Sequence, residues 1–180
     1  EFRRVLFRSG VGTIGIIDDD VVDLSNLQRQ IAHTTDRIGA SKVDSAITAV
    51  AAINPDVKVI AHKQRLTVDN AQGVIAGYDV VADGSDNFPT RFLVNDACFF
   101  AKKTLVSAAV LRFDGQLSTF RPHAGAPCYR CLYPTPPPPG QIPSCDEAGV
   151  LGAVAGVLGT LQATEVLKEI IGIGEGIDRK

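Results

Sequence analysis

The distribution of apolar and polar positions along the chain predicts strands and helices in alternation. Five segments have the continuous or alternating apolar pattern of strands, namely 13–20, 57–62, 78–82, 104–110 and 116–120. Four segments have apolar residues at helical spacing, namely 40–53, 68–76, 89–102 and 149–171. The last two strands flank a turn at 112–115 and are expected to form a hairpin.

This order favours an α/β fold, a Rossmann-like and mostly parallel sheet with helices on both faces. A long Pro-rich connection, 122–144, separates the last strand from the last helix, and loops of this length usually carry function or disorder. Glycines in the last helix weaken it by roughly 1 kcal/mol each relative to alanine. We therefore expect this helix to pack very closely against the sheet.

Composition narrows the class of protein. The 180 residues, 45% apolar and 21% charged, suit one globular domain, and the net charge of −2 gives no overall attraction to nucleic acid or to an anionic membrane. Polar and charged residues interrupt the apolar stretch 150–171, which therefore predicts a buried helix and not a membrane span. Four cysteines do not suggest a disulfide scaffold, so a cytoplasmic location is expected.

The first nine residues have neither strand alternation nor the pattern of a signal peptide. Glu1-Phe2 is also what an EcoRI site encodes in frame, so we interpret residues 1–9 as a cloning or assembly scar and set them aside. Residues 10–180 are then expected to be part of a domain that begins before Gly10.

Charged residues at the predicted strand ends and helix starts suit a nucleotide. Asp18 and Asp20 follow a buried strand, where carboxylates can bind ribose hydroxyls. Arg29 can bind phosphate in bidentate fashion, and Lys42 opens a helix, where phosphate is favoured. Asp86 follows another buried strand and could hold Mg²⁺. Each residue alone has an ordinary alternative as a cap, a turn residue or a solvated charge.

The string from Asp18 to Gln30 resembles the signature D-x-D-x-V-x-x-S-N-L-x-R-Q of the MoeB/ThiF family, which is related to the ubiquitin-activating enzymes. The same resemblance extends to Lys42 and to the segments 84–91, 127–131, 148–152 and 159–163. It implies ATP- and Mg²⁺-dependent adenylation of the C-terminal glycine of a ubiquitin-like sulfur-carrier protein. A MoaD- or ThiS-like carrier for molybdopterin or thiamine synthesis and a homodimeric enzyme are implied as well.

The resemblance also implies the members of the site. Residues expected to bind ATP are Asp18, Asp20, Ser25, Asn26, Leu27, Gln28, Arg29, Lys42, Asp86 and Asn87. Arg29, Lys42 and Mg²⁺ on Asp86 are expected to carry catalysis, because an ionised glycine carboxylate needs alignment and charge stabilisation but no general base. His33, His62 and His123 receive no role.

The glycine-rich phosphate loop of this family, G-x-G-[GA]-[LI]-G, precedes the position of Gly10 together with the first strand. Both are missing from this sequence, and the amide groups of that loop are the main cradle for the triphosphate. We therefore expect the 180-residue chain to bind ATP weakly and not to adenylate, although the whole parent protein does.

Cys128 and Cys131 form a C-x-x-C pair, which is half of a tetrahedral zinc site. MoeB-like relatives supply a second pair near the C-terminus, so we expect a structural zinc in the whole protein and little or no metal here. A redox pair is the alternative, although the usual helix N-terminus is expected to be absent. Cys145 either serves sulfur transfer as a thiol or is a loop cysteine without a role, and Cys98 is expected to be buried.

Two other functions stay open at this point. A nicotinamide-dependent oxidoreductase would need a G-x-G-x-x-G turn about 20 residues before its ribose acid, and it would leave Ser25–Gln30 and Lys42 without a purpose. A non-catalytic module that binds the carrier protein is the second alternative.

Overall fold

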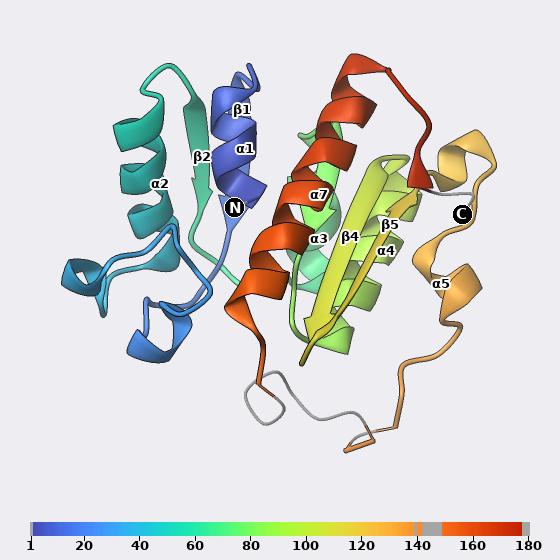
Figure 1. Ribbon diagram of the computed structural model, residues 1–180. Helices are drawn as coiled ribbons and strands as arrows, with labels where there is room; N and C mark the ends of the chain where they lie inside the picture. Colours follow the sequence, from blue (N-terminus) through green and yellow to red (C-terminus); the bar gives the residue numbers. More distant parts are fainter. Residues whose placement is uncertain (1, 139, 142–148, 178–180) are drawn as a thin grey trace. The chain divides into compact units, whose positions relative to one another are not determined.

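The structure is a computed structural model in which residues 2–138, 140–141 and 149–177 are described. The chain divides into two compact units, Glu1–Leu66 and Thr67–Lys180. Figure 1 shows the helices and strands of each unit.

The first unit consists of α1 (Phe2–Arg8), β1 (Thr13–Ile17), η1 (Leu24–Asn26), η2 (Thr35–Arg37), α2 (Lys42–Ile53) and β2 (Lys58–His62). β1 and β2 are parallel, with Thr13 opposite Lys58 and Ile17 opposite His62. Parallel neighbours need a crossover connection, which α2 provides here. The core of the unit is apolar and consists of Ile14, Ile16, Val43, Ala46, Ile47 and Val59.

The opening segment belongs to this unit, so setting residues 1–9 aside was wrong for the fold. Residues 2–8 form α1, which contacts α2. Leu6 and Phe7 are buried, and Nδ2 of Asn54 donates a hydrogen bond of 2.8 Å to the carbonyl of Phe7. The sequence analysis looked for the alternating pattern of a strand, which this segment lacks. Its apolar residues instead have the spacing of a helix. Its origin as a scar stays a prediction.

The second unit consists of α3 (Val68–Ala76), β3 (Val80–Asp83), α4 (Phe88–Ala101), β4 (Thr104–Leu111), β5 (Asp114–Phe120), η3 (Pro122–Ala124), α5 (Tyr129–Leu132) and α7 (Gly152–Ile171). Its sheet has the order β3-β4-β5. β3 and β4 are parallel, whereas β4 and β5 form the predicted antiparallel hairpin. Among the described residues, two of the three strand pairings are therefore parallel.

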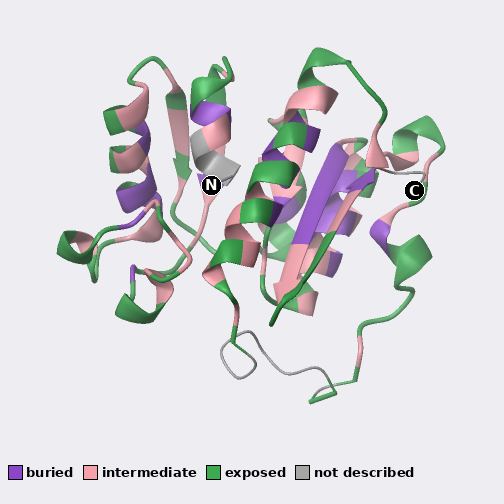
Figure 2. Ribbon diagram, viewed as in Figure 1, coloured by how far each residue is buried: buried purple, intermediate pink, exposed green. Residues whose placement is uncertain are grey.

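Helices cover both faces of this sheet, as the sequence predicted. α7 contacts β3, β4 and β5, α4 contacts β3 and β4, and the two helices lie on opposite sides of the sheet (Figure 1). β4 is buried along much of its length (Figure 2). α7 approaches the sheet closely at Gly115 of β5, where an added Cβ would lie 3.2 Å from Cδ1 of Leu158. The close packing expected at the glycines of α7 itself stays a prediction.

The segment between β5 and α7 contains short helices. η3 and α5 lie in the Pro-rich connection 122–144, of which residues 139 and 142–144 are outside the described part. α7 begins at Gly152, three residues after the expected start, because Gly149 adopts a left-handed φ of 74°. None of the helices in the described ranges has the length and apolar character that a bilayer span requires.

The packing of α1 predicts that Phe7→Ala lowers the free energy of unfolding by about 3 kcal/mol, because it leaves a cavity in a well-packed core. Phe7 is 1% exposed, whereas the neighbouring Arg8 is exposed and serves as the control. Arg8→Ala should change the free energy by less than about 0.5 kcal/mol. Urea unfolding followed by circular dichroism measures both free energies. Equal midpoints for the two variants would contradict the packing of α1 in the core.

Candidate functional site

A turn of three carboxylates follows β1. The strand ends at Ile17, earlier than predicted, so Asp18, Asp19 and Asp20 lie in the turn beyond it, with carboxylate oxygens within 4.8 Å of one another. Oδ1 of Asp18 accepts a hydrogen bond of 3.0 Å from the amide of Asp20. The carboxyl end of β1 therefore carries concentrated negative charge.

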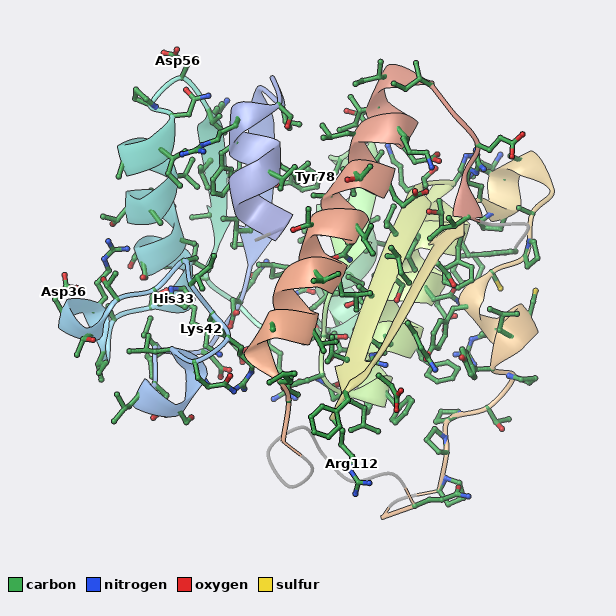
Figure 3. All side chains as sticks on the ribbon, viewed as in Figure 1. His33, Asp36, Lys42, Asp56, Tyr78 and Arg112 are labelled. Carbon is green, nitrogen blue, oxygen red and sulfur yellow. The ribbon has the colours of Figure 1, made fainter. Side chains whose placement is uncertain are left out.

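Lys42 supplies the opposite charge at the start of α2 (Figure 3). Its Nζ lies 2.8 Å from Oδ2 of Asp20, and its side chain is 11% exposed against 68% for that of Asp20. Its amide also donates to the carbonyl of Asp20 at 3.0 Å. A cation in the first turn opposes the helix dipole, so the Asp20 carboxylate stabilises a charge that the helix disfavours.

The predicted phosphate-binding segment is a short 3₁₀ helix with a well-defined cap. Asp23 accepts hydrogen bonds from the amide and the hydroxyl of Ser25, at 2.8 and 2.6 Å. These bonds hold the pKa of the Asp23 carboxyl below its ordinary value, and the bond from the Ser25 hydroxyl has the largest effect. The charge of Lys42 adds a smaller lowering of the same pKa. Nη1 of Arg29 donates to the carbonyl of Ser25 at 3.2 Å, which folds the side chain back over its own turn.

The structure thus brings most of the predicted ATP-binding residues together within the first unit. Asp18, Asp20 and Lys42 lie close together at the start of α2. Ser25 and Arg29 lie in the loop that also contains Asp23, whose carboxyl pKa is lowered slightly by the charge of Lys42. The remaining members of the segment are Asn26 and Leu27, both half-buried, and Gln28, which is exposed.

Asp86 and Asn87 lie in the second unit, in the loop between β3 and α4. Asn87 caps α4, since its side chain accepts a hydrogen bond of 2.9 Å from the amide of Thr90. Its Nδ2 lies 3.4 Å from Oδ1 of Asp86, whose side chain is exposed. Asn87 therefore orients the loop, and Asp86 offers a carboxylate to solvent.

Two residues that the sequence analysis left without a role fix this loop. Nε and Nη2 of Arg91 donate to the carbonyl of Ser85 at 3.0 and 2.8 Å, and Oδ1 of Asp83 accepts from the amide of Ser85 at 3.0 Å. Asp83 is 5% exposed, and burial raises the pKa of its carboxyl. The sequence offered one signal that Asp83 has a structural role, namely its position directly after the apolar residues of a strand. Both residues hold the backbone next to Asp86.

Gln162 of α7 supports the same strand ends. Its Nε2 donates to the carbonyls of Asp83 and Val106, at 2.8 and 2.9 Å, and so uses both hydrogens of the amide. The side chain is 5% exposed. α7 therefore ties β3 to β4 where the loop toward Asp86 begins.

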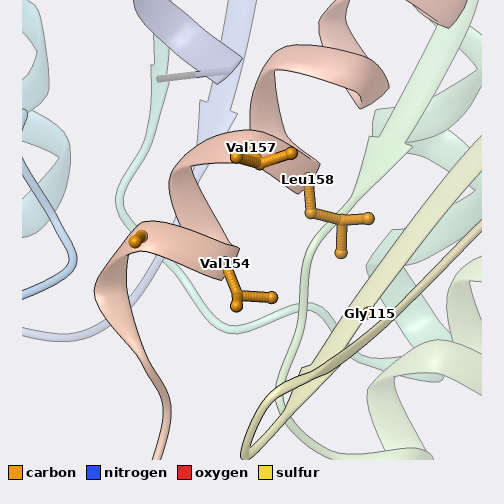
Figure 4. A pocket seen from close by; sticks show the side chains of 5 residues that line it. Gly115, Val154, Val157 and Leu158 are labelled. Atoms are coloured by element: carbon orange, nitrogen blue, oxygen red, sulfur yellow. The ribbon is translucent and has the colours of Figure 1, made fainter.

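Two cavities of different character lie among the described residues of the second unit. The first, about 340 Å³, is lined by Gly115, Ala153, Val154, Val157 and Leu158 (Figure 4). No charged side chain lines it, so it does not suit a nucleotide. The second, about 330 Å³, has Arg91, Ser107, Gln116, Tyr129 and Tyr133 among its lining residues. This mixture of cation, hydroxyl and amide groups suits a polar or anionic ligand.

The Cys128–Cys131 pair has a spacing that fits a metal site. The sulfurs lie 3.7 Å apart, too far for a disulfide bond, and the amide of Cys128 donates to Sγ of Cys131 at 3.4 Å. Two thiolates on a tetrahedral zinc ion, at about 2.3 Å each, are about 3.8 Å apart. The pair was expected to lack a helix N-terminus, which was wrong, because Cys128 is the N-cap of the four-residue helix α5.

Hydrogen bonds and an ion pair hold α5 against α4. The amide of Tyr129 donates to Oδ1 of Asn95 at 2.9 Å, and Arg130 contacts both carboxylate oxygens of Asp96 at 2.7 and 2.6 Å. The Arg130 guanidinium holds the pKa of the Asp96 carboxyl below its ordinary value. The two sulfurs therefore sit on a preformed turn.

The other cysteines differ. Cys98 is 2% exposed, as expected for a packing residue, and burial, with a smaller effect of Asp83, raises the pKa of its thiol to about 12. Cys145 lies outside the described residues, so its proposed thiol role stays a prediction.

The sequence is similar to those of known proteins. The model of the ThiF family matches residues 1–179. The "Adenylyltransferase and sulfurtransferase MOCS3" of Mus musculus is 51% identical over 171 residues, which cover 95% of this chain and 37% of that protein. The "Sulfur carrier protein adenylyltransferase" of Thermus thermophilus is 48% identical over 176 residues, 96% of this chain and 65% of that protein. The chain thus spans between 37% and 65% of the length of these relatives.

A solved structure shows the same fold. A crystal structure of MccB from E. coli superposes with a TM-score of 0.85 at 21% identity, and the match covers 98% of this chain and 54% of that one. At this identity the likeness concerns the fold alone.

The buried Asp83 predicts a specific pH dependence of stability. Its pKa is raised above the value of the unfolded chain, near 3.8, so between the two values the folded state keeps a proton that the unfolded state has lost. This contribution to stability is complete below the unfolded pKa and is lost as the pH rises through the folded pKa. Asp83→Asn, similar in shape and not titratable, should therefore gain stability relative to the wild type as the pH rises.

Urea unfolding at several pH values between about 4 and 7 measures this difference. Asp79→Asn is the matched control, because Asp79 is exposed and precedes the same strand. A constant difference between Asp83→Asn and wild type across this range would contradict the account.

Proposed function

The chain belongs to the ThiF family, and from this premise we propose that it is part of an enzyme that uses ATP to adenylate the C-terminal glycine of a ubiquitin-like sulfur-carrier protein. The observation that carries the proposal is the Asp18–Lys42 arrangement, in which strand-end carboxylates and a helix-start lysine lie next to a loop with a second cation. The relative from Thermus thermophilus is named as a sulfur carrier protein adenylyltransferase, which supports the proposal.

The proposed reaction is a displacement at the α-phosphorus of ATP. An oxygen of the glycine carboxylate forms a bond to phosphorus, the bond between the α-phosphorus and the bridging oxygen breaks, and pyrophosphate leaves. The carboxylate is already ionised, so no proton has to be removed. The enzyme has to align the two groups and stabilise charge that develops on the phosphate oxygens.

The residues of the first unit suit the nucleotide. We assign the ribose hydroxyls to Asp18 and Asp20, which offer acceptor oxygens after β1. We assign the phosphates to Arg29 and Lys42, whose cations are held on the loop and on the helix start. A phosphate that approaches Lys42 competes with Asp20 for its ammonium group, which makes this pair the expected place of rearrangement on binding.

Asp86 is proposed to hold Mg²⁺. Magnesium is usually bound by one or two carboxylates together with water and substrate phosphates, and an exposed carboxylate on a fixed loop suits that role. Asn87 is proposed to act beside it, since its side chain contacts Asp86. When bound, the ion would neutralise charge on the phosphates.

Zinc is proposed as a structural ion of the full-length protein, with Cys128 and Cys131 as two of its four ligands. The sulfur separation of 3.7 Å and the backbone hydrogen bond to Cys131 support it. The resemblance to MoeB-like proteins further supports a homodimer, a cytoplasmic location and a MoaD- or ThiS-like carrier. The contribution of Cys145 to sulfur transfer is proposed on the same resemblance.

The first test is Lys42→Ala in the full-length protein, assayed by carrier-dependent exchange of labelled pyrophosphate into ATP. Loss of the cation should reduce the exchange rate about 100-fold, because one preorganised charge at the reacting phosphates is removed. Lys63→Ala is the matched control, since Lys63 forms an exposed ion pair with Asp44 in the same unit. The control should stay within about two-fold of the wild type, as expected for a surface pair.

Equal rates for Lys42→Ala and Lys63→Ala would overturn the assignment of Lys42. Binding of a carrier protein without any exchange in the wild type would support a non-catalytic carrier-binding module instead.

The second test measures zinc by mass spectrometry of the full-length protein. About one zinc ion per chain is expected in the wild type, and Cys131→Ser should lose nearly all of it, because a site with three ligands binds far more weakly. Cys98→Ala is the control and should keep its zinc, since Cys98 is buried with a raised pKa. Full zinc content in Cys131→Ser would rule out the site.

A further inference from the structure

Two buried polar side chains and a half-buried arginine form a cluster in the same unit as Lys42 and Arg29. His33 is 7% exposed and Ser45 is 1% exposed, and Nδ1 of His33 lies 2.8 Å from Oγ of Ser45. Ser45 is on α2, three positions after Lys42, so the two residues share the first turns of that helix. Figure 3 shows His33 and Lys42 beside the start of α2.

Arg37 completes the cluster. Its Nη1 lies 2.9 Å from the carbonyl of Ser45, 3.4 Å from the Ser45 hydroxyl and 3.5 Å from the carbonyl of Ala32. Arginine only donates, so the Ser45 oxygen accepts from it and the hydroxyl hydrogen is available for Nδ1 of His33. One serine on α2 thus receives two side chains from the loop that precedes the helix.

Backbone hydrogen bonds link this cluster to Arg29. The amide of His33 donates to the carbonyl of Gln30 at 3.0 Å, and the amides of Arg29 and Gln30 donate to the carbonyl of Asn26 at 3.1 and 2.9 Å. These consecutive turns leave few free dihedral angles between His33 and Arg29. A shift of the His33 backbone relative to α2 is therefore expected to move the segment that carries Arg29.

The ends of the loop are fixed as well. The amide of Val22 donates to the carbonyl of Ala40 at 2.8 Å, and the amide of Gly39 donates to the carbonyl of Val22 at 2.9 Å. These bonds close the neck of the loop next to the Lys42–Asp20 pair. Ser45 attaches the interior of the loop to the helix one turn further on.

We propose that Ser45 and His33 are positioning residues that set the distance between the Arg29 loop and the Lys42 helix. They contact neither nucleotide nor carrier; they hold two cations from different elements in one arrangement before the nucleotide arrives. Preorganisation of this kind raises affinity because less order has to be created on binding. The inference rests on the proposed function, in which Arg29 and Lys42 bind the phosphates of ATP.

The test compares Ser45→Ala with wild type in the full-length protein. Removal of the hydroxyl should raise the Kd for a non-hydrolysable ATP analogue about five-fold, the effect of one lost hydrogen bond. Amide hydrogen exchange in residues 24–39 should accelerate by a similar factor without nucleotide. The thermal midpoint should change little, because alanine is the better helix former.

Thr48→Ala is the matched control. Its hydroxyl is also on α2, but it is exposed and donates to the carbonyl of Asp44 at 3.0 Å, one turn back on the same helix. This variant should leave both the Kd and the exchange of the loop unchanged.

A double-mutant cycle separates positioning from a general structural role. If Ser45 acts through Arg29, Ser45→Ala should change the Kd less than about two-fold in the Arg29→Ala background. A full five-fold effect in that background, or unchanged loop exchange in Ser45→Ala, would overturn the inference. A wild type that does not bind the analogue would instead overturn the proposed function, while the exchange data would still show whether Ser45 holds the loop.

Discussion

The ion pair between Lys42 and Asp20 determines the layout of the first unit. It joins the turn after β1 to the first residue of α2. The amide of Lys42 also donates a hydrogen bond to the carbonyl of Asp20, so two interactions connect the same residues. The lysine is in a position that the helix dipole disfavours, and its side chain is almost withdrawn from water. Removing the carboxylate would leave that charge without its partner, which is costly where solvent cannot compensate. The loop that contains Arg29 begins after Asp20 and ends at Lys42, so the ion pair connects its two ends.

Two carboxylates of the chain, Asp20 and Asp83, have different environments and different duties. Asp20 is exposed and paired with a cation, so it can exchange its partner when an anion arrives. Asp83 is buried and accepts a hydrogen bond from the amide of Ser85. Burial disfavours the charged form of its carboxyl and therefore raises its pKa. Its role is to shape the loop on which the exposed Asp86 lies. In the second unit the buried acid therefore holds the loop backbone, and the exposed Asp86 on that loop faces solvent.

The sequence predicted elements best where the signals are local. The helix at 68–76 has the predicted bounds, because Thr67 caps it and Gly77 ends it. Local patterns also predicted the hairpin of β4 and β5 and the start of α4 to within one residue, at 89 against Phe88 in the structure. α1 was missed because the scar interpretation set its apolar residues aside, and α5 because four residues are too few for a periodic pattern.

The candidate site was predictable in part and for a different reason. Asp18, Arg29 and Lys42 were found from their residue types at strand ends and helix starts and from a family resemblance, and their ATP contacts stay predictions. The supporting side chains were not found, because His33 and Ser45 are twelve positions apart and meet only after the loop has closed. Gln162 reaches Asp83 across 79 positions. No periodicity in the sequence encodes such contacts.

The most direct measurement of the central claim is the intact mass of a ubiquitin-like sulfur-carrier protein ending in glycine, after incubation with the full-length protein, ATP and Mg²⁺. The account predicts a mass increase of one adenylyl group, with release of pyrophosphate, and no such product from a carrier that lacks its terminal glycine. An unmodified carrier, despite a folded enzyme that binds it, would contradict the account.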